Sequence, residues 1–305
     1  MIYCVGEAVY DIIFKDDKPV EGRPGGAMLN SAVSLGRMGL PVSFVGDFAD
    51  DHIGHMTCEF LLKNGVDTTY VTFYKNARSR IALAFLDEQN NAQYTFYKIG
   101  VEKPQIILPK AGAGDIVLFG SWFGIKPEIR VSMHDFISHA KEEGALIVYD
   151  PNFRKAHLPM LEKVNTFIEE NIRLSHITKG SDEDFHFILS TSDVSRVHKY
   201  TENSGCRHFI YTANRNGVWL FGNEISKHYP ALDIKPVSTV GAGDGFNAGL
   251  VFSLVKLGLT PALLANLDEK DWDKIITTSI RFASEVCLSY DNYISNDFAK
   301  SIIDT

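Results

Sequence analysis

Short apolar runs alternate with longer amphipathic stretches along most of the chain. Five runs rich in β-branched and aromatic residues have the length and composition of buried parallel strands: Ile2–Val5, Val42–Val45, Ile116–Phe119, Leu146–Tyr149 and Phe209–Thr212. The stretches between them carry apolar residues at helical spacing: Ala27–Met38, Ile53–Asn64, Ile129–Glu143 and Leu161–Asn171. This alternation predicts an α/β fold, in which a doubly wound and mostly parallel sheet carries helices on both faces.

One region breaks this alternation. Residues 80–98 show no helical spacing and predict two strands instead, Ile81–Leu86 and Gln93–Tyr97, joined by the turn-prone residues 87–91. A hairpin without a helix does not continue the alternation of strands and helices that builds such a sheet. We therefore expect it to be an accessory element.

The extended segment Asp11–Val20 is a possible partner of this hairpin. Together the two segments would form a small β-sheet lid over a cleft, built from about residues 11–22 and 73–98. The chain shows no clear linker, internal repeat or low-complexity segment. We expect a single domain over residues 1–305 with the lid inserted in it.

Composition and charge narrow the possible functions. With 45% hydrophobic and 22% charged residues, the chain has the balance of an ordinary globular protein. Its formal net charge of −8 gives no broad basic surface, so we expect neither nucleic acid nor a membrane as a partner. Four scattered cysteines form no CxxC pair and the N-terminus lacks a signal-peptide pattern, so we expect a cytoplasmic protein.

Three glycines, Gly241, Gly243 and Gly245, crowd into a turn ahead of a helix expected over Phe246–Leu257. Glycines let the backbone turn tightly and present N–H groups to an anion, and a helix N-terminus adds partial positive charge. Asp244 lies in this turn, and two roles are open to it. It could accept a proton from an attacking hydroxyl in phosphoryl transfer, or it could cap the helix for about 1 kcal/mol.

Two earlier segments combine glycines with polar groups. Gly25 and Gly26 precede a helix rich in small residues, and Asn30 lies one turn into that helix. The pattern favours either close approach of a ligand or close packing of the helix on the sheet. The loop of residues 46–54 follows an apolar strand, where open α/β sheets bind ligands, although its aspartates also suit helix capping.

Two later segments add charged groups. Arg154 closes the run Asp150–Arg154 directly after an apolar strand, and it could neutralise phosphate or form a surface salt bridge. The run Lys179–Asp184 contains three consecutive acids, which could hold hydrated Mg²⁺ or begin a helix. Walker A and Gly-x-Ser-x-Gly sequences are absent, which argues against a P-loop NTPase and a serine hydrolase.

Taken in order along the chain, four segments resemble the ribokinase-like (PfkB) carbohydrate kinases: Gly25–Asn30, Gly46–Gly54, Asp150–Arg154 and Ser238–Phe246. The resemblance covers nearly the whole chain, and the last segment is the most specific. Within the family, three segments look most like the fructokinase branch: Asp150–Arg154, Ser181–Glu183 and Thr95–Lys98.

This resemblance implies a ribokinase-like fold and an enzyme that transfers the γ-phosphate of ATP to the primary hydroxyl of a monosaccharide. Fructose, giving fructose 6-phosphate, is the first expectation. The alternatives are a kinase of another sugar, a sugar acid or a nucleoside, and a catalytically silent sugar-binding regulatory protein. Mg²⁺ is implied as a cofactor, and a homodimer through the lid as a possible assembly.

The resemblance also implies roles for individual residues. The general base would be Asp244, and the other expected catalytic groups are Gly241, Ala242, Gly243 and Arg154. The expected sugar-binding residues are Asp11, Gly25, Gly26, Asn30 and Tyr97. The expected nucleotide-binding residues are Lys179, Thr212, Asn214, Gly217, Gly241, Gly243 and Ser284. The family's Asn-x-x-Glu pattern for Mg²⁺ falls on Ser181 and Asp184, so Asp184 is the expected metal residue.

Several positions depart from the family pattern. Ser238 stands where an acid usually opens the second signature, and residues 288–293 lack the usual Gly-Ala. Both departures argue against activation by a monovalent cation. Lys98 replaces an arginine of the lid and Asn214 a frequent glycine of the nucleotide loop, so substrate and nucleotide preferences are expected to shift.

Overall fold

The computed structural model describes residues 1–86, 92–99, 104–222 and 224–303. The turn expected over residues 87–91 lies outside them. The strands of the large sheet are β1 Ile2–Val5, β4 Val42–Ala49, β5 Val66–Asp67, β6 Val71–Tyr74, β9 Ile116–Gly120, β10 Leu146–Asp150, β11 Ile177–Ser181, β12 His208–Thr212, β13 Val218–Gly222 and β14 Ile225–Tyr229.

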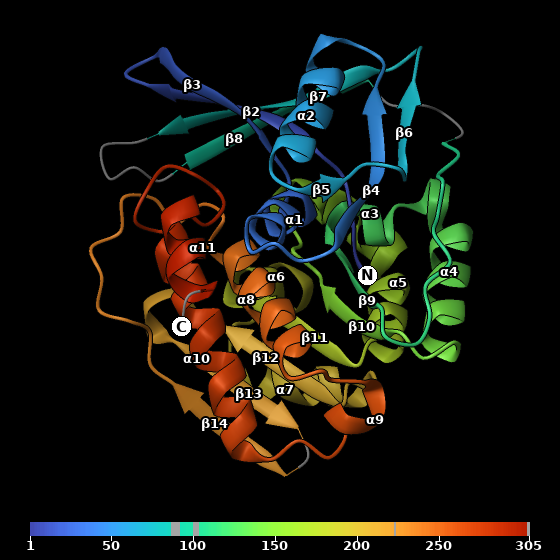
Figure 1. Cartoon of the computed structure of the whole chain (residues 1–305), viewed down its shortest axis with the longest axis vertical. Helices are drawn as coiled ribbons and strands as arrows, with labels where there is room; N and C mark the ends of the chain where they lie inside the picture. Colours follow the sequence, from blue (N-terminus) through green and yellow to red (C-terminus); the bar gives the residue numbers. More distant parts are fainter. Residues whose placement is uncertain (87–91, 100–103, 223, 304–305) are drawn as a thin grey trace.

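These strands lie in the order β14-β13-β12-β11-β10-β9-β1-β4-β5, with β6 beside β4 (Figure 1). Strand β13 pairs antiparallel with β12 and with β14. The remaining pairings are parallel. The prediction of a mostly parallel sheet is therefore confirmed. Parallel strands place their carboxyl ends on one edge, where open α/β sheets bind ligands.

Helices cover both faces of this sheet. They are α1 Ala27–Arg37, α2 His52–Lys63, α3 Ser121–Ile125, α4 Arg130–Glu142, α5 Leu161–Leu174, α6 Asp182–Leu189, α7 Val194–Asn203, α8 Ala242–Lys256, α9 Pro261–Leu264, α10 Glu269–Val286 and α11 Asn296–Ile303. Short 3₁₀ turns occur at η1 Pro127–Ile129, η2 Lys155–Met160 and η3 Asn214–Asn216. Ile2 and Cys4 of β1 join the core that includes α1, α8 and α10, whereas Tyr3 and Val5 join the core that includes α4 and α5. This period-two alternation places one apolar core on each side of the sheet.

A second, smaller sheet lies beyond the large one, at the top of Figure 1. Its strands are β2 Val9–Lys15, β3 Lys18–Gly25, β7 Arg78–Leu86 and β8 Ala92–Ile99, in the order β3-β2-β7-β8. The separate sheet expected from the sequence is confirmed, with one correction. The segment Asp11–Val20 is a tight hairpin rather than a single strand, because Asp16 (φ 52°) and Asp17 (φ 59°) take the left-handed conformation that two-residue hairpin turns require.

Helix α8 begins at Ala242, four residues before the expected start at Phe246. Gly241 takes a left-handed conformation (φ 82°) and ends the turn, so Asp244 lies within the first turn of the helix. A Cβ on Gly245 would approach Val286 to 2.8 Å, and one on Gly249 would approach Ser279 to 2.7 Å. These glycines let α8 pack closely on α10, which fixes the start of α8 at the carboxyl edge of the sheet.

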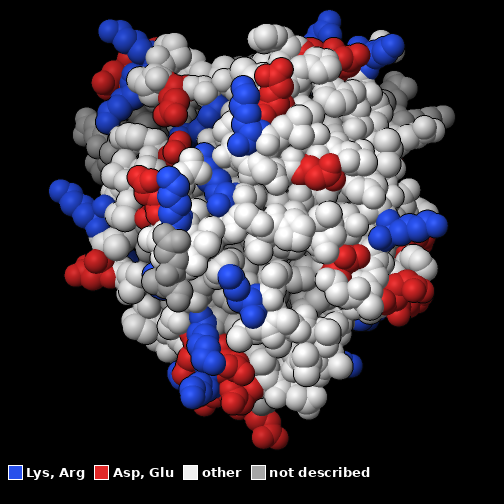
Figure 2. Space-filling view, viewed as in Figure 1, with Lys and Arg blue, Asp and Glu red and all other residues white. Residues whose placement is uncertain are grey.

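In the space-filling view, acidic and basic side chains are interspersed over the face shown (Figure 2). This distribution agrees with the absence of a broad basic surface inferred from the net charge. Among the described residues, no helix combines the length and the hydropathy that crossing a bilayer requires.

Candidate active site

Asp244 is the central group of the candidate site. Its side chain is only 8% exposed, and its Oδ2 accepts a hydrogen bond from Asn30 Nδ2 at 2.8 Å. Burial raises the pKa of Asp244 to about 7, although the hydrogen bond from Asn30 and the charges of Arg154 and Lys179 oppose the shift. A carboxylate with a pKa near neutrality can exchange a proton with a substrate at physiological pH.

The glycine turn presents backbone N–H groups beside Asp244. The first N–H groups of a helix have no carbonyl partner within it, so the start of α8 can bind an anion. A Cβ on Gly241 would lie 2.7 Å from Asn292 Cα, and one on Gly243 would lie 3.1 Å from Lys179 Nζ. Glycine is thus required sterically at Gly241, and an ammonium group stands next to Gly243.

Lys179 belongs to a buried polar network centred on Asp150. The Asp150 carboxylate is 1% exposed, and its Oδ2 accepts from Lys179 Nζ at 2.9 Å and from Asn247 Nδ2 at 2.7 Å. Its Oδ1 accepts from the Asn152 N–H at 3.1 Å. Burial alone would lower the pKa of Lys179, but Asp150 and then Asp184 raise it, so the lysine is held charged. Asn247 was not singled out from the sequence, although it lies just after the glycine turn.

Asp184 caps helix α6. Its Oδ2 accepts from the Ser181 N–H at 2.7 Å, while Ser181 Oγ accepts from the Asp184 N–H at 3.1 Å, which makes a capping box. The acids after Lys179 therefore do begin a helix, as one of the two interpretations held. Among the described residues, no group of three or more His, Cys, Asp or Glu side chains gathers in a way that could hold a metal ion. The metal-binding role of Asp184 stays a prediction.

Arg154 is exposed, and its Nη1 lies 3.4 Å from Glu183 Oε2. The surface salt bridge considered for this residue is therefore present. Arg154 also lies close enough to Asp184 and Asp244 for their charges to affect it. The side chain can thus reach the candidate site by exchanging one weak exposed ion pair for another partner.

Four of the five expected sugar-binding residues, all but Tyr97, come from β2, β3 and the start of α1, which meet here. Asp11 lies on β2 and is buried, and burial raises its pKa to about 6 against the opposing effects of Arg23 and Asn292. A Cβ on Gly25 would lie 2.2 Å from Asp11 Oδ2, and one on Gly26 (φ 121°) would lie 2.5 Å from a backbone oxygen. Gly26 is therefore required by close backbone approach, and Gly25 leaves room for the Asp11 carboxylate. The ligand contacts assigned to them stay a prediction.

Asn292 joins the Asp11 side of the site to the glycine turn. Its side chain is 1% exposed, and its Nδ2 lies 3.3 Å from Asp11 Oδ2. The sequence drew attention to residues 288–293 only as a departure from the family pattern. Nothing local marks Asn292 as part of the site, because the contact joins residues 281 positions apart.

Three of the expected nucleotide-binding residues, Thr212, Asn214 and Gly217, lie at the end of β12 and the start of β13. Thr212 ends β12 and is the register partner of Ser181 on β11. Asn214 (φ 48°) opens the turn η3, and Gly217 (φ 89°) closes it, where a Cβ would lie 2.2 Å from a backbone oxygen. Ser284 is half-buried on α10. The structure places Thr212, Asn214 and Gly217 at the ends of β12 and β13 and Ser284 in the last turn of α10, and their contacts to nucleotide stay a prediction.

Tyr97 lies on β8 and is 57% exposed. Its side chain is not part of the buried cluster around Asp244 and Asp11. A contact between Tyr97 and sugar would require the small sheet to approach the ligand. That contact remains a prediction, and the side chain of Lys98 lies outside what the structure describes.

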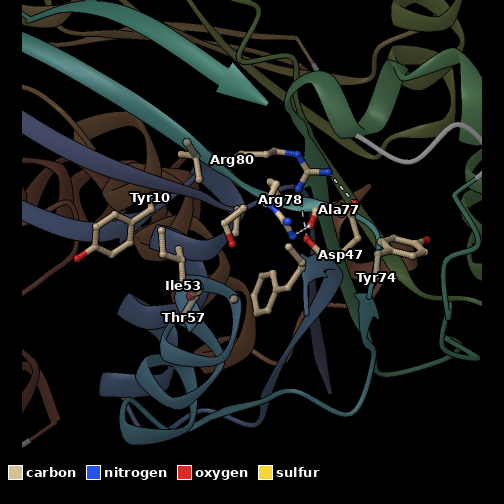
Figure 3. Close-up of a pocket in the computed structure, with 14 residues that line it drawn as sticks. Tyr10, Asp47, Ile53, Thr57, Tyr74, Ala77, Arg78 and Arg80 are labelled. Atoms are coloured by element: carbon tan, nitrogen blue, oxygen red, sulfur yellow. Dashed lines mark hydrogen bonds and ion pairs between the residues drawn. The ribbon is translucent and has the colours of Figure 1, made fainter. Parts of the chain in front are cut away.

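A cavity of about 30 Å³ lies at the base of the small sheet (Figure 3). Arg80 and Asp47 meet across it, with Arg80 Nη2 2.6 Å from Asp47 Oδ2. Space of this size holds one or two water molecules rather than a sugar. The ion pair joins β7 of the small sheet to β4 of the large one.

Comparison with known proteins identifies the family. The sequence pattern of the pfkB family carbohydrate kinases matches residues 1–297. Fructokinase-1 of Zea mays is 29% identical over 269 residues, covering 86% of this chain and 80% of that protein. The fructokinase of Rhizobium leguminosarum bv. trifolii is 28% identical over 279 residues, covering 88% and 85%. An aminoimidazole riboside kinase of Salmonella enterica superposes with a TM-score of 0.82 at 21% identity, over 99% of both chains. The family expected from the motifs is confirmed, and the chain belongs to the pfkB family of carbohydrate kinases.

Proposed function

We propose that this protein transfers the γ-phosphoryl group of ATP to the primary hydroxyl of a monosaccharide, with fructose as substrate and fructose 6-phosphate as product. One observation carries the proposal: the buried Asp244 carboxylate, with its pKa raised to about 7, stands in the first turn of α8 beside the glycine turn. A base and an anion site next to each other are what phosphoryl transfer to an alcohol requires.

In the reaction, the acceptor oxygen forms a bond to the γ-phosphorus, and the bond between that phosphorus and the β,γ-bridging oxygen breaks. The hydroxyl proton passes to Asp244 Oδ1, because Oδ2 already accepts from Asn30. Asn30 thus holds the carboxylate in one orientation. The reaction leaves ADP and the phosphorylated sugar, and the proton returns from Asp244 to water.

Negative charge on the transferring group is stabilised by fixed dipoles and by cations. The N–H groups of Gly241, Ala242 and Gly243 lie at the N-terminus of α8, where the Ala242 N–H also donates to the Thr239 carbonyl at 3.3 Å, and a helix N-terminus carries about half a positive charge. Lys179 adds an ammonium group next to Gly243. Arg154 adds a guanidinium that is free to leave its exposed pair with Glu183.

The nucleotide would lie along the edge formed by Thr212, Asn214 and Gly217, with Ser284 on α10 at its far end. Mg²⁺ would accompany the triphosphate and neutralise its charge. Asp184 Oδ1 is buried without a hydrogen-bond partner among the described residues. It could therefore accept a hydrogen bond from a water molecule that coordinates the ion. Ser238 Oγ accepts from the Val240 N–H at 3.2 Å, so a neutral hydroxyl takes the place of the usual acid, and turnover would not require a monovalent cation.

The acceptor would be held by Asp11, Gly25, Gly26 and Asn30. The small sheet would act as a lid, carrying Tyr97 towards the sugar and excluding water from the phosphoryl group. Strand β3 lies at one end of the strand order of this sheet, and two copies would dimerise through the sheet. The segment Gly241–Asp244 argues against a simple sugar-binding protein, because such a protein needs no base beside an anion site.

Fructose is favoured over other acceptors by the fructokinases of Zea mays and Rhizobium leguminosarum bv. trifolii, which are related over most of this chain. A nucleoside acceptor is the second candidate. It is favoured by the superposition on a Salmonella enterica kinase described as complexed with aminoimidazole riboside and an ATP analogue.

A coupled assay of ADP release with a panel of fructose, glucose, ribose, gluconate and a purine nucleoside tests the proposal. We expect the highest kcat/KM with fructose. A higher value with another acceptor would reject fructose but retain the kinase. If no acceptor raises ADP release above the rate without acceptor, the kinase itself is rejected and a silent binding protein remains.

A further inference from the structure

Beneath the small sheet, beside Asp11, lie buried side-chain atoms that make no hydrogen bond within the described residues. Arg23 on β3 is 5% exposed, and its Nε and Nη1 atoms make no hydrogen bond. The carbonyl oxygen Oδ1 of the buried Asn292 also lacks a donor. Buried polar groups are almost always paired, because an unpaired one loses its hydration without compensation. Three buried atoms without a hydrogen bond at one place, one of them with only long ion pairs to Asp291 and Glu21, therefore point to a bound molecule.

These groups face one another. Arg23 is the register partner of Asp11 across the hairpin, and opposite residues in an antiparallel pair project from the same face of the sheet. Arg23 Nη1 lies 3.6 Å from Asp291 Oδ1, next to Asn292. Asn292 Nδ2 in turn lies 3.3 Å from Asp11 Oδ2. The three side chains thus line one corner below the small sheet.

The corner is connected to the reaction centre. The backbone of Asn292 packs on Gly241, where a Cβ would approach Asn292 Cα and O to 2.7 Å. A molecule in contact with the Asn292 side chain is therefore held at a fixed distance from the glycine turn and from Asp244.

We propose that Arg23 and Asn292 contact the acceptor directly, completing the subsite around Asp11, and that this subsite takes adjacent hydroxyl groups of a neutral acceptor rather than a carboxylate. The proposal rests on the sugar kinase function proposed above. Arg23 offers donors, whereas Asp11 and the Asn292 carbonyl offer acceptors. A hydroxyl is both donor and acceptor, so it satisfies both kinds of group at once.

Local charge decides against an anionic acceptor. One cation, Arg23, stands among three carboxylates: Asp11 and, at 3.6 and 3.7 Å, Asp291 and Glu21. A sugar acid would bring a fourth negative group next to them. Its carboxylate would be repelled, whereas a neutral diol is not.

The test compares Arg23→Met and Asn292→Ala with Arg130→Met. Arg130 is also a buried arginine in an ion pair, with Glu170 at 2.6 Å, but it lies on α4, away from the site. We expect the acceptor KM to rise at least about tenfold in the first two variants, with the KM for ATP changed less than about twofold. Arg130→Met should lower the melting temperature and leave the acceptor KM unchanged.

Calorimetry of acceptor binding without nucleotide separates this proposal from the kinase itself, because it needs no turnover. Wild-type protein should bind fructose more tightly than gluconate. A fructose analogue lacking one contacted hydroxyl should lose about tenfold in affinity for the wild type and nothing further for Asn292→Ala. If either variant fails to fold, Arg23→Lys and Asn292→Ser replace them, with a smaller rise in acceptor KM expected.

The proposal is overturned if the site variants keep the wild-type KM for the acceptor. It is also overturned if the KM for the acceptor and the KM for ATP rise by the same factor in these variants. It is also overturned if gluconate binds as tightly as fructose, or if none of the neutral acceptors binds. Loss of ADP release with intact fructose binding would reject the kinase proposal and leave this one standing.

Discussion

Two buried carboxylates at the same edge of the sheet have very different surroundings. Asp150 accepts hydrogen bonds from Lys179, Asn247 and the backbone of Asn152. Asp244 accepts one side-chain hydrogen bond, from Asn30, and burial raises its pKa to about 7. A fully partnered carboxylate holds elements together, whereas an under-partnered one is kept reactive at a cost to stability. Asp150 thus joins β10 to β11 and α8, whereas Asp244 is available for proton transfer.

Removing the reactive carboxylate tests one half of this comparison. Asp244→Asn keeps the shape and the polar contact with Asn30 but cannot take a proton. We expect kcat to fall by about 10³-fold, the range for losing a general base. Steady-state ADP release at saturating substrates measures it. A variant that keeps more than about a tenth of the wild-type kcat would contradict the role of base.

Removing the partnered carboxylate tests the other half. Asp150→Ala leaves the Lys179 ammonium buried without its counter-charge, so the free energy of unfolding should fall by about 3–5 kcal/mol. Urea unfolding measures it. The double variant Asp150→Leu with Lys179→Met should recover most of the loss, because it removes both charges. Equal losses in the single and double variants would show that the ion pair is not the cause.

The cost of keeping Asp244 reactive should appear in the pH dependence of stability. A carboxyl whose pKa rises from 3.8 to about 7 on folding binds its proton more tightly when folded. Its contribution to stability is therefore complete below the unfolded pKa and is lost as the pH rises through about 7. Asp244→Asn does not titrate.

Urea unfolding of this variant and of the wild type at pH 4 and pH 8 should therefore show a difference that grows in favour of the variant at the higher pH. A difference that is independent of pH would mean that burial of Asp244 has no such cost.

The smallest effect is expected at the capping box of α6. Ser181→Ala removes the acceptor for the Asp184 N–H and should lower the free energy of unfolding by about 1 kcal/mol. Ser226→Ala, at an exposed position on β14, is the matched control and should change it little. If the two variants are equally stable, the cap contributes nothing and Asp184 is not held by it.

Local patterns in the sequence predicted much of the fold. The apolar runs Ile2–Val5 and Leu146–Tyr149 are strands within one residue of their expected bounds, because a buried parallel strand is apolar throughout. Strand β11 was missed, since Lys179 and Gly180 interrupt its apolar run. Lys179 departs from the pattern because its ammonium lies in the polar network at Asp150, whereas Gly180 leaves room for the buried Phe185 ring.

The candidate site was predictable where a motif is local and not where the fold joins distant segments. The glycine turn around Gly241 and the base Asp244 lie within one short run. The contact between Asn30 and Asp244 spans 214 positions, and that between Asn292 and Asp11 spans 281. The family resemblance predicted Asn30 and Asp11 as site residues. It did not predict Asn292, because only the packing of the folded chain places this residue next to Asp11.

The dependence of the acceptor kcat/KM on pH, measured for the wild type, tests the role of Asp244 most directly. Because the base must be ionised and burial raises its pKa to about 7, kcat/KM should fall about tenfold for each pH unit below that value. This decrease of kcat/KM at low pH should be absent from the residual activity of Asp244→Asn. A wild-type profile that is flat between about pH 5 and pH 8, or a decrease that persists in the variant, would contradict the assignment of Asp244 as the base.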